Sequence, residues 1–219
     1  MSSAPVSPDP EKTAAGAPRR RKATRQARRS QLIEATIDCL ARRGYSDTTL
    51  AEVAQGAGLS RGIVNFHFES KEKLLVATLQ HMAEEYAGHW RAALDKAGDD
   101  PASQLMALVR ADFDPAICSR RKLAAWCAFW GEAKSRPTYQ ALCGSRDEAY
   151  QMLLVRLCTE LTEAGGYSHD PKAVAIALDA LLEGLWLRLM MAESRLSRSS
   201  AAAAATEFLR IAFPGHFSG

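Results

Sequence analysis

The sequence predicts an all-α protein, and three features of the 219-residue chain lead to that prediction. Apolar residues recur three or four positions apart over most of the chain, which is the spacing of one face of a helix. Glycines and prolines punctuate the chain between these stretches. No stretch alternates apolar and polar residues over a useful length, so no strand is predicted.

The periodic stretches predict a succession of helices that differ in length and in how they begin. In chain order they are expected at residues 29–43, 49–56, 60–67, 71–96, 102–112, 120–134, 137–164, 171–195 and 199–212. Thr49, Ser60 and Ser70 stand at the start of the second, third and fourth helices, where a hydroxyl can cap free backbone N–H groups. Gly44 is expected to end the first helix.

The charge of the chain is unevenly distributed. The whole chain carries 28 basic and 25 acidic residues, for a net charge of +3. Residues 1–75 carry 13 against 8, and residues 76–219 carry 15 against 17. A basic first third suggests a polyanionic partner for that part, although a solubilising tail is an equally good explanation.

Most of the cations in the first third lie near the N-terminus. Residues 1–27 are rich in Pro, Ala, Ser and Arg without an apolar period, so they are predicted to form a disordered basic arm. The cations of this arm follow one another closely: Arg19-Arg20-Arg21-Lys22, then Arg25, Arg28 and Arg29. They could lie along a phosphate backbone or in a minor groove of a nucleic acid, and the alternative is a solvated charge run.

Residues 48–68 have the layout of a helix-turn-helix. A short helix is followed by a tight turn at Gly56-Ala57-Gly58 and by a second short helix with few acids. In such a motif the first helix crosses the DNA backbone, and the second offers its side chains to base edges in the major groove. Ala54 and Gly58 are small where the two helices are expected to approach closely.

The chemistry of the motif predicts several DNA contacts. Arg61 can reach guanine or a phosphate, Asn65 can pair with adenine, and Ile63 can meet a thymine methyl group. The hydroxyls of Thr49 and Ser60 can approach phosphates. Lys71 adds a further cation in the first turn of a helix, where backbone N–H groups already attract anions.

The motif resembles the N-terminal domain of the TetR family of bacterial repressors along its full length. The pattern is Thr-Thr-x-x-x-Val-Ala-x-x-Ala-Gly-Leu-Ser-x-Gly from Thr48, followed by Phe68, Lys71 and Leu74-Leu75. The resemblance implies a cytoplasmic homodimer that binds a palindromic operator in double-stranded DNA. It also implies a phosphate contact at His67. The family usually carries Tyr at the positions of both Asn65 and His67.

The resemblance suggests how the chain is divided. Residues 1–27 would be the arm, residues 28–75 the DNA-binding domain with its motif at 49–68, and residues 76–219 a helical ligand-binding and dimerisation domain.

Aromatic and acidic residues gather in the second half of the chain. Trp126 and Trp130 are four positions apart, as are Asp179 and Glu183, so each pair shares a helix face. Carboxylates on an apolar helix are costly unless they are paired, and Arg188 is one partner within reach. Aromatic faces beside a carboxylate can hold a quaternary ammonium group, although an aromatic stripe more often belongs to a plain core. The predicted ligand site comprises Trp126, Phe129, Trp130, Tyr139, Asp179, Glu183 and Trp186.

Three blocks of the second half resemble the choline-responsive repressors of the glycine-betaine pathway. The blocks are residues 112–114, 122–130 and 179–188, and the similarity covers about residues 28–212. It implies control of the genes for choline uptake and oxidation, with choline relieving repression. Because these blocks also occur in relatives that sense other molecules, a different amine or a hydrophobic inducer is the alternative.

The last two helices are predicted to form the dimer surface. Gly184 and the run Ala201–Ala205 permit close helix approach. A second apolar stripe is predicted to face the partner, at Val174, Leu178, Leu181, Leu185 and Leu189. Burial of these helices against each other within one chain is the alternative.

Other classes of protein are not favoured. Residues 173–191 are apolar enough to suggest a membrane span, but three charged residues interrupt them, so a buried helix is predicted. The chain has no nucleophile elbow, P-loop or dinucleotide fingerprint, so neither an enzyme nor a cofactor is expected. A helical enzyme or binding module without a role on DNA is a remote alternative.

No metal site is predicted, because His81, Glu85 and His89 share a helix face over two turns, which is too long a span for one ion. Five cysteines without a C-x-x-C pair fit a reducing compartment.

Overall fold

The structure, a computed structural model, describes residues 16–191 and 196–217, apart from the side chains of residues 16–23 and 143–147. Within these residues the regular elements are all helical, so the predicted all-α class is confirmed. The helices are α2 (Gly16–Arg43), α3 (Leu50–Gly56), α4 (Arg61–His67), α5 (Lys71–Ala97), α6 (Pro101–Asp112), α7 (Arg120–Ala133), α8 (Pro137–Gly165), α9 (Pro171–Met191) and α10 (Arg198–Ala212).

Helix α2 is much longer than the sequence predicts. It was expected to begin at residue 29 after a disordered arm, but it begins at Gly16, so residues 16–27 are helical. The segment is rich in Ala, Arg, Lys and Gln, which are good helix formers. Its proline, Pro18, lies in the first turn, where the missing N–H group has no helical partner to lose. Residues 1–15 of the predicted arm lie outside the described residues.

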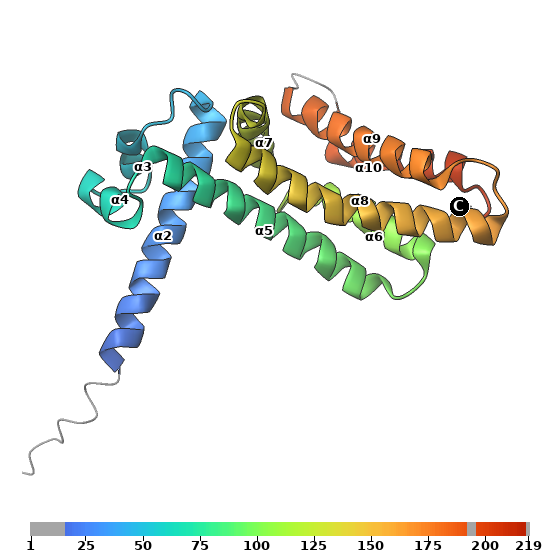
Figure 1. Ribbon diagram of the computed structural model, residues 1–219, viewed down its shortest axis with the longest axis horizontal. Helices are drawn as coiled ribbons and strands as arrows, with labels where there is room; N and C mark the ends of the chain where they lie inside the picture. The colour runs from blue at the N-terminus through green and yellow to red at the C-terminus, as the bar shows by residue number, and fades with distance from the viewer. Residues whose placement is uncertain (1–15, 192–195, 218–219) are drawn as a thin grey trace, which may run out of the picture.

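A small helical head occupies one end of the molecule (Figure 1). It consists of the second half of α2, the helices α3 and α4, and the start of α5. Its core is a cluster of fully buried apolar side chains: Leu32, Ile33, Ile37, Leu40, Val53, Val64, Leu74 and Leu75. Burial of these side chains fixes α4 against the rest of the head.

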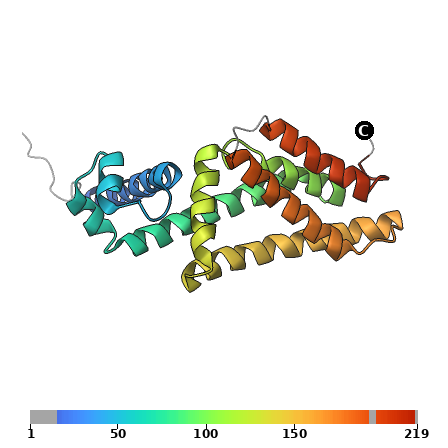
Figure 2. The same ribbon diagram turned by 90° about the horizontal axis from the view of Figure 1, so that it is seen from above.

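The helical body behind the head is built from α5 to α10. Helix α5 runs from the head into the body without a break (Figure 1), so the predicted boundary between residues 75 and 76 falls inside one helix. Helix α7 lies across the long helices at the junction of head and body (Figure 2). A rigid element therefore links any ligand site in the body to the head.

The apolar face of α9 that remains exposed differs from the predicted one. Leu178, Leu185 and Leu189 are buried within their own chain, because they pack against the other helices of the body. The exposed apolar residues on the last two helices are instead Ile176, Leu187, Met191 and Ile211. No helix in the described ranges is both long and apolar enough to cross a membrane.

Candidate functional site

The start of α3 shows the predicted cap at Thr49. The Glu52 backbone N–H donates to Thr49 Oγ1 at 3.3 Å, and the Thr49 backbone N–H donates to Glu52 Oε2 at 3.2 Å. This reciprocal pair satisfies two backbone donors that the helix itself leaves free. The Thr49 hydroxyl also lies 3.2 Å from Glu52 Oε2, so it is held in the cap, and the residue remains exposed.

The turn between α3 and α4 depends on the backbone of Gly58. This residue has φ +62°, a left-handed conformation that a side chain would strain, and a Cβ atom there would meet no other atom within 4 Å. Gly58 is thus needed for its conformation and not, as predicted, for close helix approach. The Leu59 backbone N–H donates to Ala54 O at 2.9 Å and fixes the angle at which α4 leaves the turn.

Helix α4 has one buried and one exposed face. Its cap is Ser60, whose Oγ accepts from the Ile63 backbone N–H at 3.4 Å. Val64 and Phe68 are buried and anchor the helix, while Arg61, Asn65 and Phe66 are exposed. A short helix that is anchored by buried residues and exposes an arginine and an asparagine is suited to reading base edges.

Phe66 is an exposed residue of α4 that the sequence did not single out. Its side chain is 71% exposed, an unusual position for a phenylalanine. The sequence spacing could have predicted this exposure. Phe66 lies two positions from both Val64 and Phe68 and therefore on the opposite face of the helix.

His67 and Lys71 are less open than predicted. His67 is half-buried, and burial, together with the charges of Arg25 and Arg29, lowers the pKa of its imidazole below the ordinary value. The ring is therefore uncharged at neutral pH. The Lys71 ammonium donates to Tyr45 O at 3.1 Å and to Ser46 O at 3.0 Å, so it fastens the loop after α2.

The body holds a small cavity of about 30 Å3 that is lined from five helices, α5 to α9. Its lining is aromatic and acidic: Tyr86, Asp112, Trp130, Tyr150, Asp179, Leu182, Glu183 and Trp186. Four of the predicted ligand residues are therefore brought together: Trp130, Asp179, Glu183 and Trp186. A fifth, Trp126, does not line the cavity but stacks on Trp130 with ring centroids 6.2 Å apart.

Asp112 is the central acid of this cavity. Its side chain is only 2% exposed, and the hydroxyls of Tyr86 and Tyr150 donate to its two oxygens at 2.7 and 3.2 Å. The indole N–H of Trp186 donates to the Asp112 carbonyl oxygen at 3.0 Å. Burial, and next the charge of Asp112, raise the pKa of Tyr150 well above its usual value, so Tyr150 remains a hydrogen-bond donor at any physiological pH.

Aromatic rings surround the acid. The Tyr86 ring lies 5.6 Å from Trp186 and 6.0 Å from Tyr150, measured between centroids. The predicted ligand set omitted Tyr86, Asp112 and Tyr150. The two acids of the run Asp112-Phe113-Asp114, at the end of α6, could have drawn attention to Asp112. Tyr86 could not be recognised in this way, because it has the spacing of an ordinary core residue.

Two predicted ligand residues do not line this cavity. Phe129 and Tyr139 form a separate aromatic cluster with Tyr45 at the junction of head and body, with centroid distances of 5.5 to 6.4 Å. The hydroxyls of Tyr45 and Tyr139 are 2.8 Å apart. Phe129 is next to Trp130 on α7 and so points about 100° away from it, toward the head rather than into the cavity.

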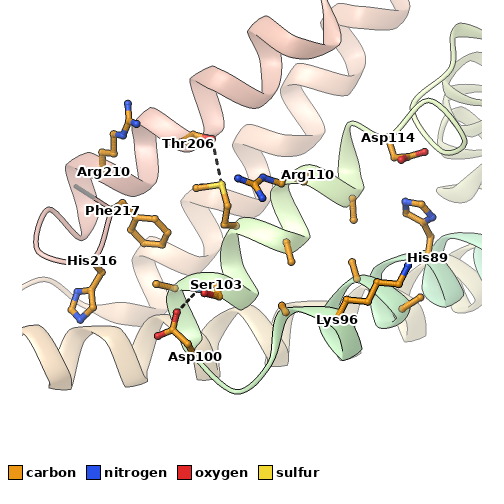
Figure 3. Close-up of a pocket in the computed structure, with 17 residues that line it drawn as sticks. His89, Lys96, Asp100, Ser103, Arg110, Asp114, Thr206, Arg210, His216 and Phe217 are labelled. Atoms are coloured by element: carbon orange, nitrogen blue, oxygen red, sulfur yellow. Dashed lines mark hydrogen bonds between the residues drawn. The ribbon is translucent and has the colours of Figure 1, made fainter. Parts of the chain in front are cut away.

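A larger hollow of about 760 Å3 lies between α5, α6 and α10 (Figure 3). Its lining carries five basic or imidazole side chains, Lys96, Arg110, Arg210, His89 and His216, against the two acids Asp100 and Asp114. Its one benzene ring belongs to Phe217. A cationic ligand would meet like charges here, so the smaller aromatic cavity is the better candidate for an amine.

The histidines and cysteines of the described residues show no metal site. His81 faces Glu34 at 3.5 Å and Glu85 pairs with Lys122 at 2.6 Å, whereas His89 lines the larger hollow. No group of three metal-ligating side chains occurs among the described residues. Cys39, Cys118, Cys127 and Cys158 are free thiols, and burial raises the pKa of Cys158 to about 12, as for a core residue.

Comparison with family models gives two matches that together cover both halves of the chain. Residues 32–78 match the bacterial regulatory proteins of the tetR family. Residues 101–214 match the C-terminal domain of the BetI-type transcriptional repressors.

Curated relatives and solved structures agree with these matches. The HTH-type transcriptional regulator BetI of Burkholderia thailandensis is 35% identical over 185 residues, which are 84% of this chain and 93% of that protein. A Pseudomonas aeruginosa PAO1 protein described as a transcriptional regulator superposes with a TM-score of 0.75 at 28% identity, covering 88% of this chain and 93% of the other. A Saccharomonospora viridis protein, also described as a transcriptional regulator and solved in complex with choline, gives a TM-score of 0.74 at 21% identity, covering 83% and 95%.

Proposed function

Since the chain belongs to the TetR family and carries the C-terminal domain of the BetI-type transcriptional repressors, we propose that it represses genes of choline uptake and oxidation as a homodimer and that choline releases it from its operator. The observation that carries this proposal is the buried Asp112 within an aromatic cavity. The alternative is a repressor of the same family that senses another amine or a hydrophobic molecule.

The exposed face of α4 supports a role in reading a palindromic operator. Arg61 and Asn65 are exposed on it next to Phe66, while Thr49 and Ser60 cap the N-termini of the two motif helices. We propose that Arg61 and Asn65 contact bases and that the two helix N-termini, with Ile63 and His67 at the edge of the face, approach the phosphates.

Replacing Arg61 or Asn65 by alanine is expected to weaken operator binding by about 5- to 150-fold, because a bidentate base contact is worth about 1–3 kcal/mol. Fluorescence anisotropy with DNA from the protein's own promoter region measures the loss. Arg156→Ala, an exposed arginine on α8, is the control and should bind as the native protein does. Unchanged affinity in both α4 variants would exclude α4 as the reading helix.

The cavity in the body has the chemistry of a quaternary ammonium site. The indole rings of Trp130 and Trp186 and the phenol rings of Tyr86 and Tyr150 provide π-faces around an acid that water does not reach. A methylated ammonium cannot donate hydrogen bonds, so cation–π contacts and a nearby negative charge are what bind it. The chain solved with choline shares this fold, which supports choline as the occupant proposed here.

Choline has to enlarge this cavity when it binds. The space of about 30 Å3 is room for about one water molecule, so side chains of the lining have to move apart. Tyr86 belongs to α5, whose first residue, Lys71, lies in the head. The two residues are about 22 Å apart along the helix axis. We propose that displacement of Tyr86 tilts α5 and so changes the distance between the two heads of the dimer.

A second link joins the cavity to the head through α7. Trp130 lies on this helix, and Arg121 near its start donates to Asp38 Oδ1 at 2.5 Å and to Glu34 Oε2 at 2.7 Å on α2. Movement of α7 would therefore also be transmitted to α2.

Choline is expected to raise the melting temperature by about 5–10 °C at 100 times its Kd, because binding at that excess stabilises by about 2.7 kcal/mol. Thermal shift measures this, with betaine aldehyde and ethanolamine as comparison ligands. Trp130→Leu should lose the shift, whereas Tyr139→Phe should keep it because Tyr139 lies outside the cavity. A shift with ethanolamine and none with choline would favour the alternative inducer.

The exposed stripe on the last two helices supports the proposed dimer. Large apolar side chains at Ile176, Leu187, Met191 and Ile211 are exposed, and a Cβ atom at Gly184 would meet nothing within 4 Å of its own chain. Such a surface favours an interface. A palindromic operator needs two recognition helices about 34 Å apart, which only a two-fold dimer provides.

A further inference from the structure

We propose that the helical extension of α2, residues 19–29, is a second DNA-binding element that contacts the phosphates flanking each half-site. This inference depends on the proposed function, because it assigns a further contact to the same DNA partner. Of the two interpretations that the sequence left open, a DNA contact and a solvated charge run, it adopts the first.

The extension carries a high density of positive charge. Seven cations stand between residues 19 and 29, namely Arg19, Arg20, Arg21, Lys22, Arg25, Arg28 and Arg29. No acidic residue occurs between Glu11 and Glu34. The like charges of such a helix repel one another, and binding of a polyanion relieves that repulsion.

The described cations of the extension have no acidic partner. Among the residues whose side chains the structure describes, no ion pair involves Arg25, Arg28 or Arg29, and Arg28 bonds only to the neutral Gln31, at 2.9 Å. This contrasts with Arg121 on α7, which pairs with two carboxylates. The charges of Arg25, Arg28 and Arg29 are thus available to an external anion.

Contacts with α4 place the extension next to the reading face. The Arg25 guanidinium lies 5.6 Å from the centroid of the Phe66 ring, and that of Arg29 lies 5.3 Å from the Phe68 ring. Phe66 belongs to the exposed face of α4, so Arg25 stands beside the surface that faces DNA. After burial, the charges of Arg25 and Arg29 are the next causes that lower the pKa of His67, so both arginines lie close to the C-terminal end of α4.

The extension is also positioned by its continuity with the head. Residues 19–29 belong to the same helix as the buried Leu32 and Ile33, and this helix projects from the head away from the body (Figure 1). The segment is about 15 Å long, enough to pass several phosphates that are spaced about 3.4 Å apart along a strand. A disordered tail would pay an ordering cost on binding that this helix avoids.

The test compares two quadruple variants that remove the same charge. One, called the arm variant, replaces Arg19, Arg20, Arg21 and Lys22 by glutamine. The control, called the body variant, replaces four exposed arginines of the body by glutamine: Arg91, Arg120, Arg156 and Arg210. Operator affinity is measured by anisotropy from 50 to 300 mM salt, on a long duplex and on one trimmed to the two half-sites.

The arm variant is expected to bind the long duplex at least tenfold more weakly at 150 mM salt. Its slope of log affinity against log salt should be shallower by about 2–4, at about 0.9 for each lost phosphate contact. On the trimmed duplex it should differ little from the native protein, and the body variant should keep the native slope on both.

An arm variant with the native slope and affinity on the long duplex would overturn the inference while leaving the reading head intact. If the arm variant loses binding to phosphatidylserine vesicles but keeps the native dependence of DNA affinity on salt, the extension binds a membrane surface. That result would also overturn the inference. If the native protein itself shows no salt-dependent DNA binding, the proposed function fails, which is a different result.

Discussion

Replacing both Leu187 and Ile211 by glutamate is expected to convert the protein into monomers and to weaken operator binding by about 10²- to 10⁴-fold. Each head alone recognises only one half-site. Joining two heads makes the second binding step intramolecular and raises affinity by about that factor. The two side chains are 44% and 74% exposed in the single chain, so the substitution should not unfold the monomer directly.

Light scattering coupled to size-exclusion chromatography gives the mass, and anisotropy with the full operator gives the affinity. Met152→Glu is the matched control, because Met152 is a similarly exposed apolar side chain on α8, outside the last two helices. A double variant that remains a dimer with native affinity would show that another surface joins the subunits.

Replacing Asp112 by asparagine is expected to weaken choline binding by about 100-fold while changing the melting temperature little. A unit charge about 4 Å from an ammonium contributes about 4 kcal/mol at an effective dielectric constant of 20, and part of this is offset by desolvation. Asparagine keeps the shape of the side chain and can still accept a hydrogen bond from Tyr86 or Tyr150.

The same exchange at Asp179 and Glu183 shows which carboxylate binds the ligand. Glu183 is exposed and Asp179 accepts a hydrogen bond from Gln151 Nε2 at 3.0 Å, so we expect Asp179→Asn and Glu183→Gln to cost less than tenfold. Isothermal titration calorimetry provides the three affinities. A larger loss at either of these positions than at Asp112 would place the ammonium at the mouth of the cavity instead of beside the buried acid.

The sequence was sufficient to predict the helices and the motif because their signals are local. Hydroxyl caps at Thr49 and Ser60 and the glycine of the turn act within a few residues of their own positions. The early start of α2 was missed because its N-terminal half has no apolar period. Its propensity for helix comes from Ala, Arg and Gln rather than from a buried face.

The lining of the aromatic cavity was only half predicted because its geometry is tertiary. Trp130, Asp179, Glu183 and Trp186 were found from spacing within one helix, but their meeting point with Tyr86, Asp112 and Tyr150 depends on how five helices pack. Phe129 was assigned to the same site as one of several aromatic residues of this region, although it is adjacent to Trp130 and adjacent helical residues diverge.

The proposed dimer surface illustrates a further limit of periodicity. Helix α9 is apolar around most of its circumference, so the sequence shows more than one apolar stripe and does not say which one faces inward. The structure assigns Leu178, Leu185 and Leu189 to the core and leaves Ile176, Leu187 and Met191 exposed.

The most direct test is a titration of choline into the preformed complex of protein and labelled promoter DNA, followed by anisotropy. The proposed mechanism predicts that DNA is released over the choline concentrations at which the cavity fills, and that the Asp112→Asn variant requires about 100-fold more. The mechanism would be contradicted if DNA stayed bound with unchanged affinity after choline had saturated the protein. A ligand that binds equally well at both distances between the two heads cannot shift the equilibrium between them.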